Sequence, residues 1–312
     1  MLEIRPASRL AALTIAGWLA SGGTASAQPA ERAEAWLADL YDDVAADLIA
    51  GRPLVVQVHV PLCDNDVLRC GNDRLGDGDD PGRNLYWATS GGFRGWFGRR
   101  GSGWTEVHRG RGPEADVLEV RVWRRQVAPG GTLRARGVRR PFPVYVVATA
   151  WRGEAIQSAM AAFGADLYGT GAVRRVSLSG GGAKGTVIDA GAAAQVVAFV
   201  GHNGWMDVGE VSWPAAPPDA RRKGAIAIAC LTEDYLADAV PSARRVPLLF
   251  TRSLLFAGAH SLEGAVRAFA EGRGLLAIRD GAAAAYAEGQ DKPVARARAA
   301  FTNPADRRWK RR

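Results

Sequence analysis

Long apolar runs are absent from this sequence, and cysteine is scarce. The N-terminal apolar segment, Leu10 to Leu19, spans about ten residues, and no later run reaches 18. Because a helix needs roughly 20 apolar residues to cross a bilayer, we expect no membrane span in the mature protein. The chain has only three cysteines among 312 residues. This odd number excludes complete pairing within one chain and leaves one thiol over.

Two glycine- or aspartate-rich segments lack the spacing of the binding loops that they superficially resemble. Residues 180–186 do not follow the G-x-x-x-x-G-K-[ST] pattern of a phosphate-binding loop. Residues 77–80, within an acidic segment from Asp73 to Asn84, do not match the D-x-[DN]-x-[DN]-G pattern of a calcium loop. We therefore expect no cofactor and no metal, with a calcium-dependent surface protein as a weaker alternative.

The N-terminus has the order of segments that is typical of a secretory signal peptide. A weakly basic start with Arg5 and Arg9 precedes the apolar segment, and small residues ending in Ala25-Ser26-Ala27 follow it. This pattern predicts cleavage after Ala27 and export to the periplasm or the medium. Residues 28–312 then form the mature chain, which is long enough for one large domain.

Basic residues exceed acidic ones, and arginine greatly outnumbers lysine. The formal net charge is +8, or +7 without the first 27 residues. The charge is spread along the chain, and its densest cluster is Arg307 to Arg312. In an exported protein, a solvated terminus explains such a cluster better than a nucleic-acid partner does. We therefore predict a single domain over residues 28–300, a basic tail over 301–312 and no nucleic-acid ligand.

Apolar segments of two lengths alternate along the mature chain. Short apolar runs bounded by turn or charged residues predict buried strands, and longer amphipathic segments predict helices. The predicted strands span residues 54–60, 104–108, 117–123, 144–150, 196–200, 225–229 and 246–256. The predicted helices span 31–50, 154–167 and 232–240, the last capped by Thr232, and another opens at 261. This alternation predicts an α/β fold with a mostly parallel sheet covered on both faces, with surface loops at 171–186 and 212–224.

A histidine, a cysteine and an Asp-Asn pair follow three of the predicted strands. Asp64 and Asn65 follow the first strand, His202 follows the fifth, and Cys230 follows the sixth. Because the carboxyl ends of parallel strands meet at one edge of the sheet, these side chains are expected to converge there. A histidine can generate the thiolate that makes cysteine a nucleophile, and a carboxylate or amide can orient the histidine. The backbone N–H groups of Cys230 and Gly204 are candidate oxyanion donors.

The same segments resemble the caspase, legumain and gingipain clan of cysteine peptidases. That clan carries an apolar strand that ends in His-Gly, followed by an apolar strand that ends in Ala-Cys or Ser-Cys. This chain has Val-Val-Ala-Phe-Val-Gly-His202-Asn-Gly204 and then Ala-Ile-Ala-Ile-Ala-Cys230. The order of histidine before cysteine matches, whereas Asn203 separates the histidine from the glycine.

The resemblance implies a three-layer α/β/α sandwich of caspase-like type. It also implies an exported cysteine peptidase that acts on a peptide or protein substrate. Cys230 is then the nucleophile and His202 the general base, and Asn65, or alternatively Asp64, orients the histidine.

Residues after the nucleophile shape the substrate pocket in this clan, so the resemblance implies Arg252 or Ser253 as pocket residues. The alternative is a catalytically inactive caspase-like protein with a periplasmic binding or interaction role.

The pairing of the cysteines decides whether Cys230 is available as a nucleophile. Exported proteins tend to pair their cysteines, and Cys63 and Cys70 lie seven residues apart across a loop. Their pairing leaves Cys230 as the free thiol. A Cys63–Cys230 disulfide is the open alternative, because both residues follow strand ends, and it would abolish the nucleophile.

Overall fold

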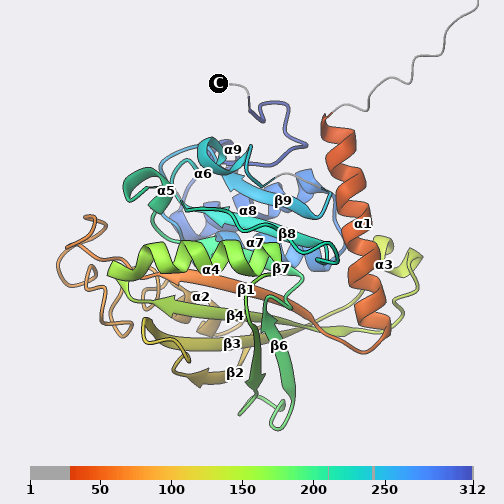
Figure 1. Cartoon of the computed structure of the whole chain (residues 1–312), viewed down its shortest axis with the longest axis horizontal. Coiled ribbons are helices and arrows are strands. Elements are labelled where there is room, and N and C mark those ends of the chain that lie inside the picture. Colours follow the sequence, from red (N-terminus) through yellow and green to blue (C-terminus); the bar gives the residue numbers. More distant parts are fainter. Residues whose placement is uncertain (1–28, 210, 241–242, 311–312) are drawn as a thin grey trace, which may run out of the picture.

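The computed structural model describes residues 29–209, 211–240 and 243–310. Residues 1–27, which we expect to be a signal peptide, lie outside the described residues. Helices cover both faces of one large sheet, and a two-stranded hairpin projects from the body of the molecule (Figure 1). The helices are α1 (Pro29–Ile49), α2 (Phe93–Gly98), α3 (Gly131–Ala135), α4 (Ile156–Tyr168), α5 (Gly204–Asp207), α6 (Thr232–Leu236), α7 (Ala259–Ala270), α8 (Leu275–Gln290) and α9 (Val294–Ala299). The strands are β1 (Leu54–Pro61), β2 (Thr105–Gly110), β3 (Val117–Val127), β4 (Phe142–Trp151), β5 (Val173–Ser177), β6 (Val187–Gly191), β7 (Val196–Val200), β8 (Lys223–Ile228), β9 (Arg245–Thr251) and β10 (Phe301–Thr302).

The large sheet has eight strands in the order β10-β9-β8-β7-β1-β4-β3-β2. β4, β1, β7, β8 and β9 run parallel, whereas β2–β3, β3–β4 and β9–β10 are antiparallel pairs. The predicted α/β class with a mostly parallel sheet is confirmed. The carboxyl ends of the parallel strands lie at one edge, which is where open α/β sheets place their ligands.

The central strands are buried because nearly all their side chains are apolar on both faces. Every residue of β7 and of β8 is buried, as is typical of parallel strands between two helical layers. On one face, Val56 and Val58 of β1 share a core with Leu37 of α1 and Leu262 of α7. On the other face, α4 and α6 pack over β7 and β8. None of the helices that the structure describes is both long and apolar enough to cross a bilayer.

A buried polar chain joins α4 to the sheet and to the hairpin of β5 and β6. His59 Nε2 lies 3.0 Å from Asp166 Oδ2, and Trp151 Nε1 donates to His59 Nδ1 at 3.2 Å. Because Nδ1 accepts this bond, Nε2 carries the proton and donates to Asp166. Arg174 also donates to the Asp166 carboxylate, at 2.9 Å. These partners allow a fully buried carboxylate to exist in the core.

Several local expectations are wrong. Part of the segment 171–186, expected as a surface loop, forms β5, which pairs with β6 in an antiparallel hairpin. Thr232 does not cap α6, because its Oγ1 donates to the Ala227 carbonyl at 2.9 Å instead. α6 ends at Leu236 rather than at Val240, and β9 ends at Thr251 rather than at 256.

The segment 301–310, expected as part of a basic tail, belongs to the fold. β10 pairs with β9 at the edge of the large sheet. The buried Asn303 then donates its Nδ2 to the carbonyls of Leu248 and Leu275, at 3.0 and 2.6 Å. These directional bonds hold the segment against β9 and α8, and a count of charges does not reveal them.

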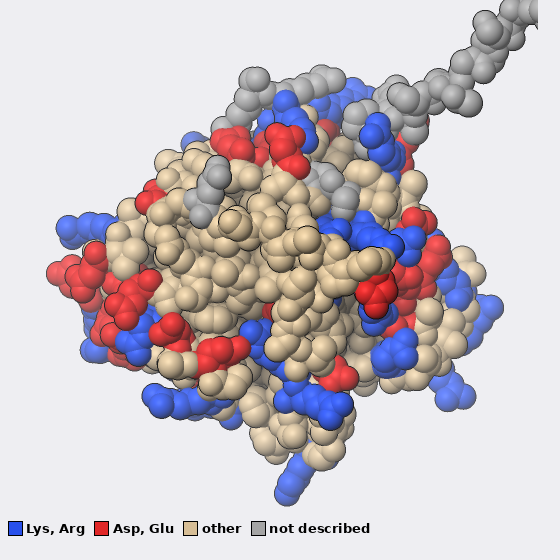
Figure 2. All heavy atoms as spheres, in the orientation of Figure 1, with Lys and Arg blue, Asp and Glu red and all other residues tan. Residues whose placement is uncertain are grey.

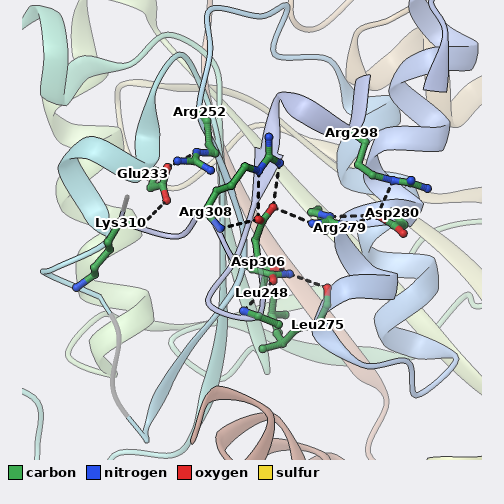
Figure 3. A network of polar contacts seen from close by, with 12 residues as sticks. Glu233, Leu248, Arg252, Leu275, Arg279, Asp280, Arg298, Asp306, Arg308 and Lys310 are labelled. Atoms are coloured by element: carbon green, nitrogen blue, oxygen red, sulfur yellow. Dashed lines mark hydrogen bonds and ion pairs between the residues drawn. The ribbon is translucent and has the colours of Figure 1, made fainter. Parts of the chain in front are cut away.

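Asp306 is the centre of an ion-pair network in the same segment (Figure 3). Arg279 Nη1 donates to its Oδ2 at 2.8 Å, and Arg308 Nη2 does so at 3.0 Å. Burial by itself raises the pKa of Asp306, but the hydrogen bonds from Arg308 and Arg279 outweigh this effect and lower the pKa to about 2.

Replacing Asp306 by asparagine is expected to destabilise the fold near pH 7 and to have little effect near pH 2. The unfolded-state pKa is about 3.9, so the carboxylate contributes fully above that pH. Its contribution is lost as the pH falls through the folded-state value of about 2. The difference in pKa corresponds to at most about 2.6 kcal/mol of unfolding free energy. Urea unfolding of both proteins at pH 7 and pH 2 measures it, and Asp238→Asn, at an exposed ion pair, is the control. Equal urea midpoints for the wild type and Asp306→Asn at pH 7 would contradict the prediction.

Candidate active site

The turns after β7 and β8 hold His202 and Cys230 at the same edge of the sheet. The two strands are parallel neighbours, and the Gly201 N–H donates to the Ile228 carbonyl at 3.1 Å. Further along, Asn203 Nδ2 donates to the carbonyl of Cys230 at 2.5 Å. The two bonds couple the backbones, so the expected base and nucleophile are held on adjacent turns.

Cys230 stands at the start of a strained turn. It is a free, partly exposed thiol. Leu231, which follows it, has φ 56° and ψ 32°, in the left-handed region that a bulky side chain rarely adopts. The Leu231 N–H donates to the Ser253 carbonyl at 3.3 Å, and the Cys230 thiol lies 3.7 Å from the Leu255 carbonyl oxygen. Backbone strain of this kind clusters at functional sites.

Tyr86 adjoins His202, and no pattern in the sequence indicates this contact. Its ring meets the His202 imidazole edge to face, with centroids 5.7 Å apart. Burial raises the pKa of Tyr86, and the negative charge of a Cys230 thiolate raises it further. The phenol therefore stays protonated at neutral pH. Phe256 contacts Tyr86 as well, with ring centroids 6.1 Å apart. The site therefore combines a thiol, an imidazole and a phenol, with the Phe256 ring next to the phenol.

The loop that carries Tyr86 is fixed by a disulfide and by a buried asparagine. Cys63 and Cys70 form the predicted disulfide, and the alternative Cys63–Cys230 pairing is wrong. Asn84 is fully buried, and its Oδ1 accepts the N–H groups of Cys63 and Tyr86 at 3.0 and 3.1 Å. Its Nδ2 donates to the Cys63 carbonyl at 2.7 Å. The Asn84 amide therefore ties the position of Tyr86 to the carboxyl end of β1.

His202 is a partly buried imidazole that favours its neutral form. Burial lowers its pKa, and the carboxylate of Asp207 only partly opposes this effect. Its Nε2 is buried and has no hydrogen-bond partner among the residues that the structure describes. A neutral imidazole with an unpaired ring nitrogen can accept a proton from a thiol or from water.

Asp64 and Asn65 lie at the carboxyl end of β1, but their side chains are used within the loop. Asp64 Oδ1 accepts the N–H of Asp66 at 3.0 Å, which forms an Asx turn. Asn65 Oδ1 accepts the N–H of Cys70 at 3.0 Å. In the described part of the chain, neither side chain forms a hydrogen bond with His202. The structure therefore brings His202 together with Tyr86 rather than with Asp64 or Asn65.

The two expected oxyanion donors differ in their availability. The Gly204 N–H donates to the His202 carbonyl at 3.2 Å, so this group is occupied. Packing explains the glycine at position 204, because a Cβ there would lie 2.2 Å from Met160 Sδ. By contrast, the N–H of Cys230 donates to no acceptor within the described ranges. Of the two, only Cys230 has a backbone donor available beside the sulfur.

The expected pocket residues lie in the loop after β9, next to Cys230. Arg252 forms an ion pair with Glu233 at 2.7 Å, and only 10% of its side chain is exposed. Ser253 contributes its carbonyl to the turn after Cys230. Leu254 is the exposed residue of this loop, at 72%, so an apolar side chain rather than the arginine is presented to solvent beside the thiol.

The described residues include no group of three or more His, Cys, Asp or Glu side chains that could hold a metal ion. Comparison with protein-family models, with curated proteins and with solved structures finds no match.

Thiol titration of the denatured, unreduced protein is expected to yield one thiol per chain. The Cys63–Cys70 disulfide leaves Cys230 as the free cysteine, so peptide mapping should find the label on Cys230. Cys230→Ala should titrate as zero, which is the matched control. Three thiols in the wild type, or a label on Cys63 or Cys70, would contradict the pairing.

Proposed function

We propose that this chain is an exported cysteine peptidase of caspase-like type, with Cys230 as nucleophile and His202 as general base. The observation that carries the proposal is the coupling of the two turns, in which Asn203 of the histidine turn bonds the carbonyl of Cys230. In chain order, the histidine follows the third parallel strand and the cysteine the fourth. This placement agrees with the resemblance of the two strand motifs to the clan.

The proposed reaction begins when His202 accepts the thiol proton of Cys230 and the sulfur attacks a peptide carbonyl carbon. The C–N bond then breaks, the leaving amine takes the proton from His202, and a thioester remains on Cys230. Water, deprotonated by His202, hydrolyses the thioester and restores the thiol. The Cys230 N–H donates to the developing oxyanion, and the protonated phenol of Tyr86, whose ring meets His202, is a further donor in the proposed site.

Export to an oxidising compartment belongs to the same proposal. The disulfide between Cys63 and Cys70 supports it, because such bonds persist mainly outside the reducing cytosol. The secretory pattern of residues 1–27 points the same way. The proposed substrate is a peptide or protein, and the proposed reaction requires no cofactor.

A catalytically inactive binding protein on the same scaffold is the second candidate. Two observations favour it: the Gly204 N–H is occupied, and His202 has no carboxylate or amide hydrogen-bonded to it among the described side chains. An inactive relative would keep the disulfide and the sheet but would not turn over an acyl group at Cys230.

An electrophilic peptide probe is expected to label the wild type at Cys230. Cys230→Ala should abolish labelling, and His202→Ala should slow it by about a hundredfold or more, because general base assistance of this kind contributes 10²–10⁴-fold. His108→Ala changes a partly exposed histidine on β2, which lies 3.0 Å from the Ser177 carbonyl oxygen, and it should label at the wild-type rate. Labelling that survives Cys230→Ala, or equal rates for His202→Ala and His108→Ala, would favour the binding protein.

The labelling rate should stay at its maximum down to a lower pH than it would if the base were a histidine with the usual pKa of 6.5. Because burial lowers the pKa of His202 below its usual value of 6.5, the neutral base persists through pH 6.5 and is lost only below it. A pH series from 4.5 to 8 with the same probe measures the acidic limb. A midpoint above pH 7 would show that another group controls the reaction.

A further inference from the structure

The hairpin of β5 and β6 is a rigid projection anchored to the core. Val176 and Ile188 pack with Val107 and Val122 of the large sheet. Arg174 of β5 reaches the fully buried Asp166, which also binds His59. In Figure 1 the hairpin extends away from the helical layers. Its position is therefore set by buried contacts, although most of its surface is exposed.

β5 has an edge with no partner strand. The N–H of Ala192 donates to the carbonyl of Ala172, and the N–H of Leu178 donates to the carbonyl of Thr186. Because hydrogen-bonded pairs alternate along an antiparallel ladder, the even-numbered residues of β5 form the backbone hydrogen bonds to β6. The backbone groups of Val173 and Arg175 then point away from β6. The second sheet contains only β5 and β6, so no strand of the described chain pairs with these groups. Unpaired backbone N–H and C=O groups along a strand edge can pair with an added strand.

A cavity of about 480 Å³ runs along this edge. Its lining includes all of β5, together with His108, Arg111 and Glu114 and with Val120 and Val147 of the large sheet. His108 Nδ1 lies 3.0 Å from the Ser177 carbonyl oxygen, so the open part of the edge is at Val173 and Arg175. The cavity therefore offers a short unpaired backbone edge next to apolar side chains, which suits an extended chain with alternating side chains.

The charge of the cavity favours an acidic ligand. Its lining holds Arg111, Arg174 and Arg175 but only one carboxylate, Glu114. Arg174 forms ion pairs with Glu114 and Asp166. The side chain of Arg175 is 82% exposed, and its Nε lies 3.6 Å from Asp189 Oδ1 across the hairpin. Figure 2 shows basic side chains gathered around the projecting hairpin.

We propose that this edge binds an extended acidic peptide, which adds to β5 as a third strand of the hairpin sheet. A second copy of the chain is a poor occupant, because two β5 edges would bring their arginines together. This inference does not depend on the thiol site, and its test reads binding rather than turnover. Cys230→Ala should therefore bind as the wild type does.

The probe is a fluorescein-labelled hexapeptide of alternating threonine and glutamate, and its matched control replaces glutamate by glutamine. By fluorescence anisotropy at low salt, the acidic peptide should bind about tenfold more tightly, since each exposed ion pair adds up to about 1 kcal/mol. Amide hydrogen exchange should show new protection at Val173 and Arg175. Equal affinity of the two peptides, or no protection at these amides, would overturn the proposal.

Two variants at one position separate strand addition from simple charge attraction. Val173→Pro removes an outward N–H at the first residue of β5, where proline is tolerated because the bond to β6 is not lost. It should weaken binding about tenfold, whereas Val173→Thr keeps the N–H and should bind like the wild type. Arg175→Glu should weaken the acidic peptide and not the glutamine peptide. Wild-type affinity of Val173→Pro, at an unchanged unfolding midpoint, would show that no strand is added.

Discussion

The parallel pairing of β7 with β8 is the constraint on which the candidate site depends. Both strands are buried on both faces, so they have almost no room for polar side chains. The first polar groups that they can present lie in the turns at their carboxyl ends, where the backbone leaves the sheet. The hydrogen bonds from Gly201 and Asn203 fix the position of one turn relative to the other. A slip of one residue would turn every side chain of a strand to the other face and would separate the base from the nucleophile.

That constraint also explains why part of the site could be predicted from the sequence. A strand buried on both faces is an uninterrupted apolar run, and such a run ends visibly where His202 and Cys230 follow it. The disulfide was predictable for a different reason, because Cys63 and Cys70 are close in sequence and their pairing closes a short loop. In both cases a local pattern was sufficient.

The remaining parts depend on contacts that no local pattern records. Tyr86 reaches the site because Asn84 bonds to both ends of a long loop without periodicity. Asn65 has the sequence position of an orienting residue. Its side-chain oxygen instead accepts a hydrogen bond from the nearby N–H of Cys70, as Asn side chains in loops often do. The hairpin of β5 and β6 was missed because its exposed face carries no apolar alternation and its anchor, Arg174, bonds to a carboxylate on another element.

His202 contacts Tyr86 instead of the expected Asn65 or Asp64, and this has a consequence for the chemistry that we propose. A carboxylate bonded to a histidine favours the imidazolium form, whereas an aromatic edge restrains the ring without adding negative charge. Burial of His202 acts in the same direction, because it disfavours the charged ring. The resting imidazole is therefore expected to be neutral, with Nε2 able to accept a proton. In the proposed reaction His202 becomes positively charged only when it takes the thiol proton of Cys230 as the sulfur attacks the carbonyl carbon.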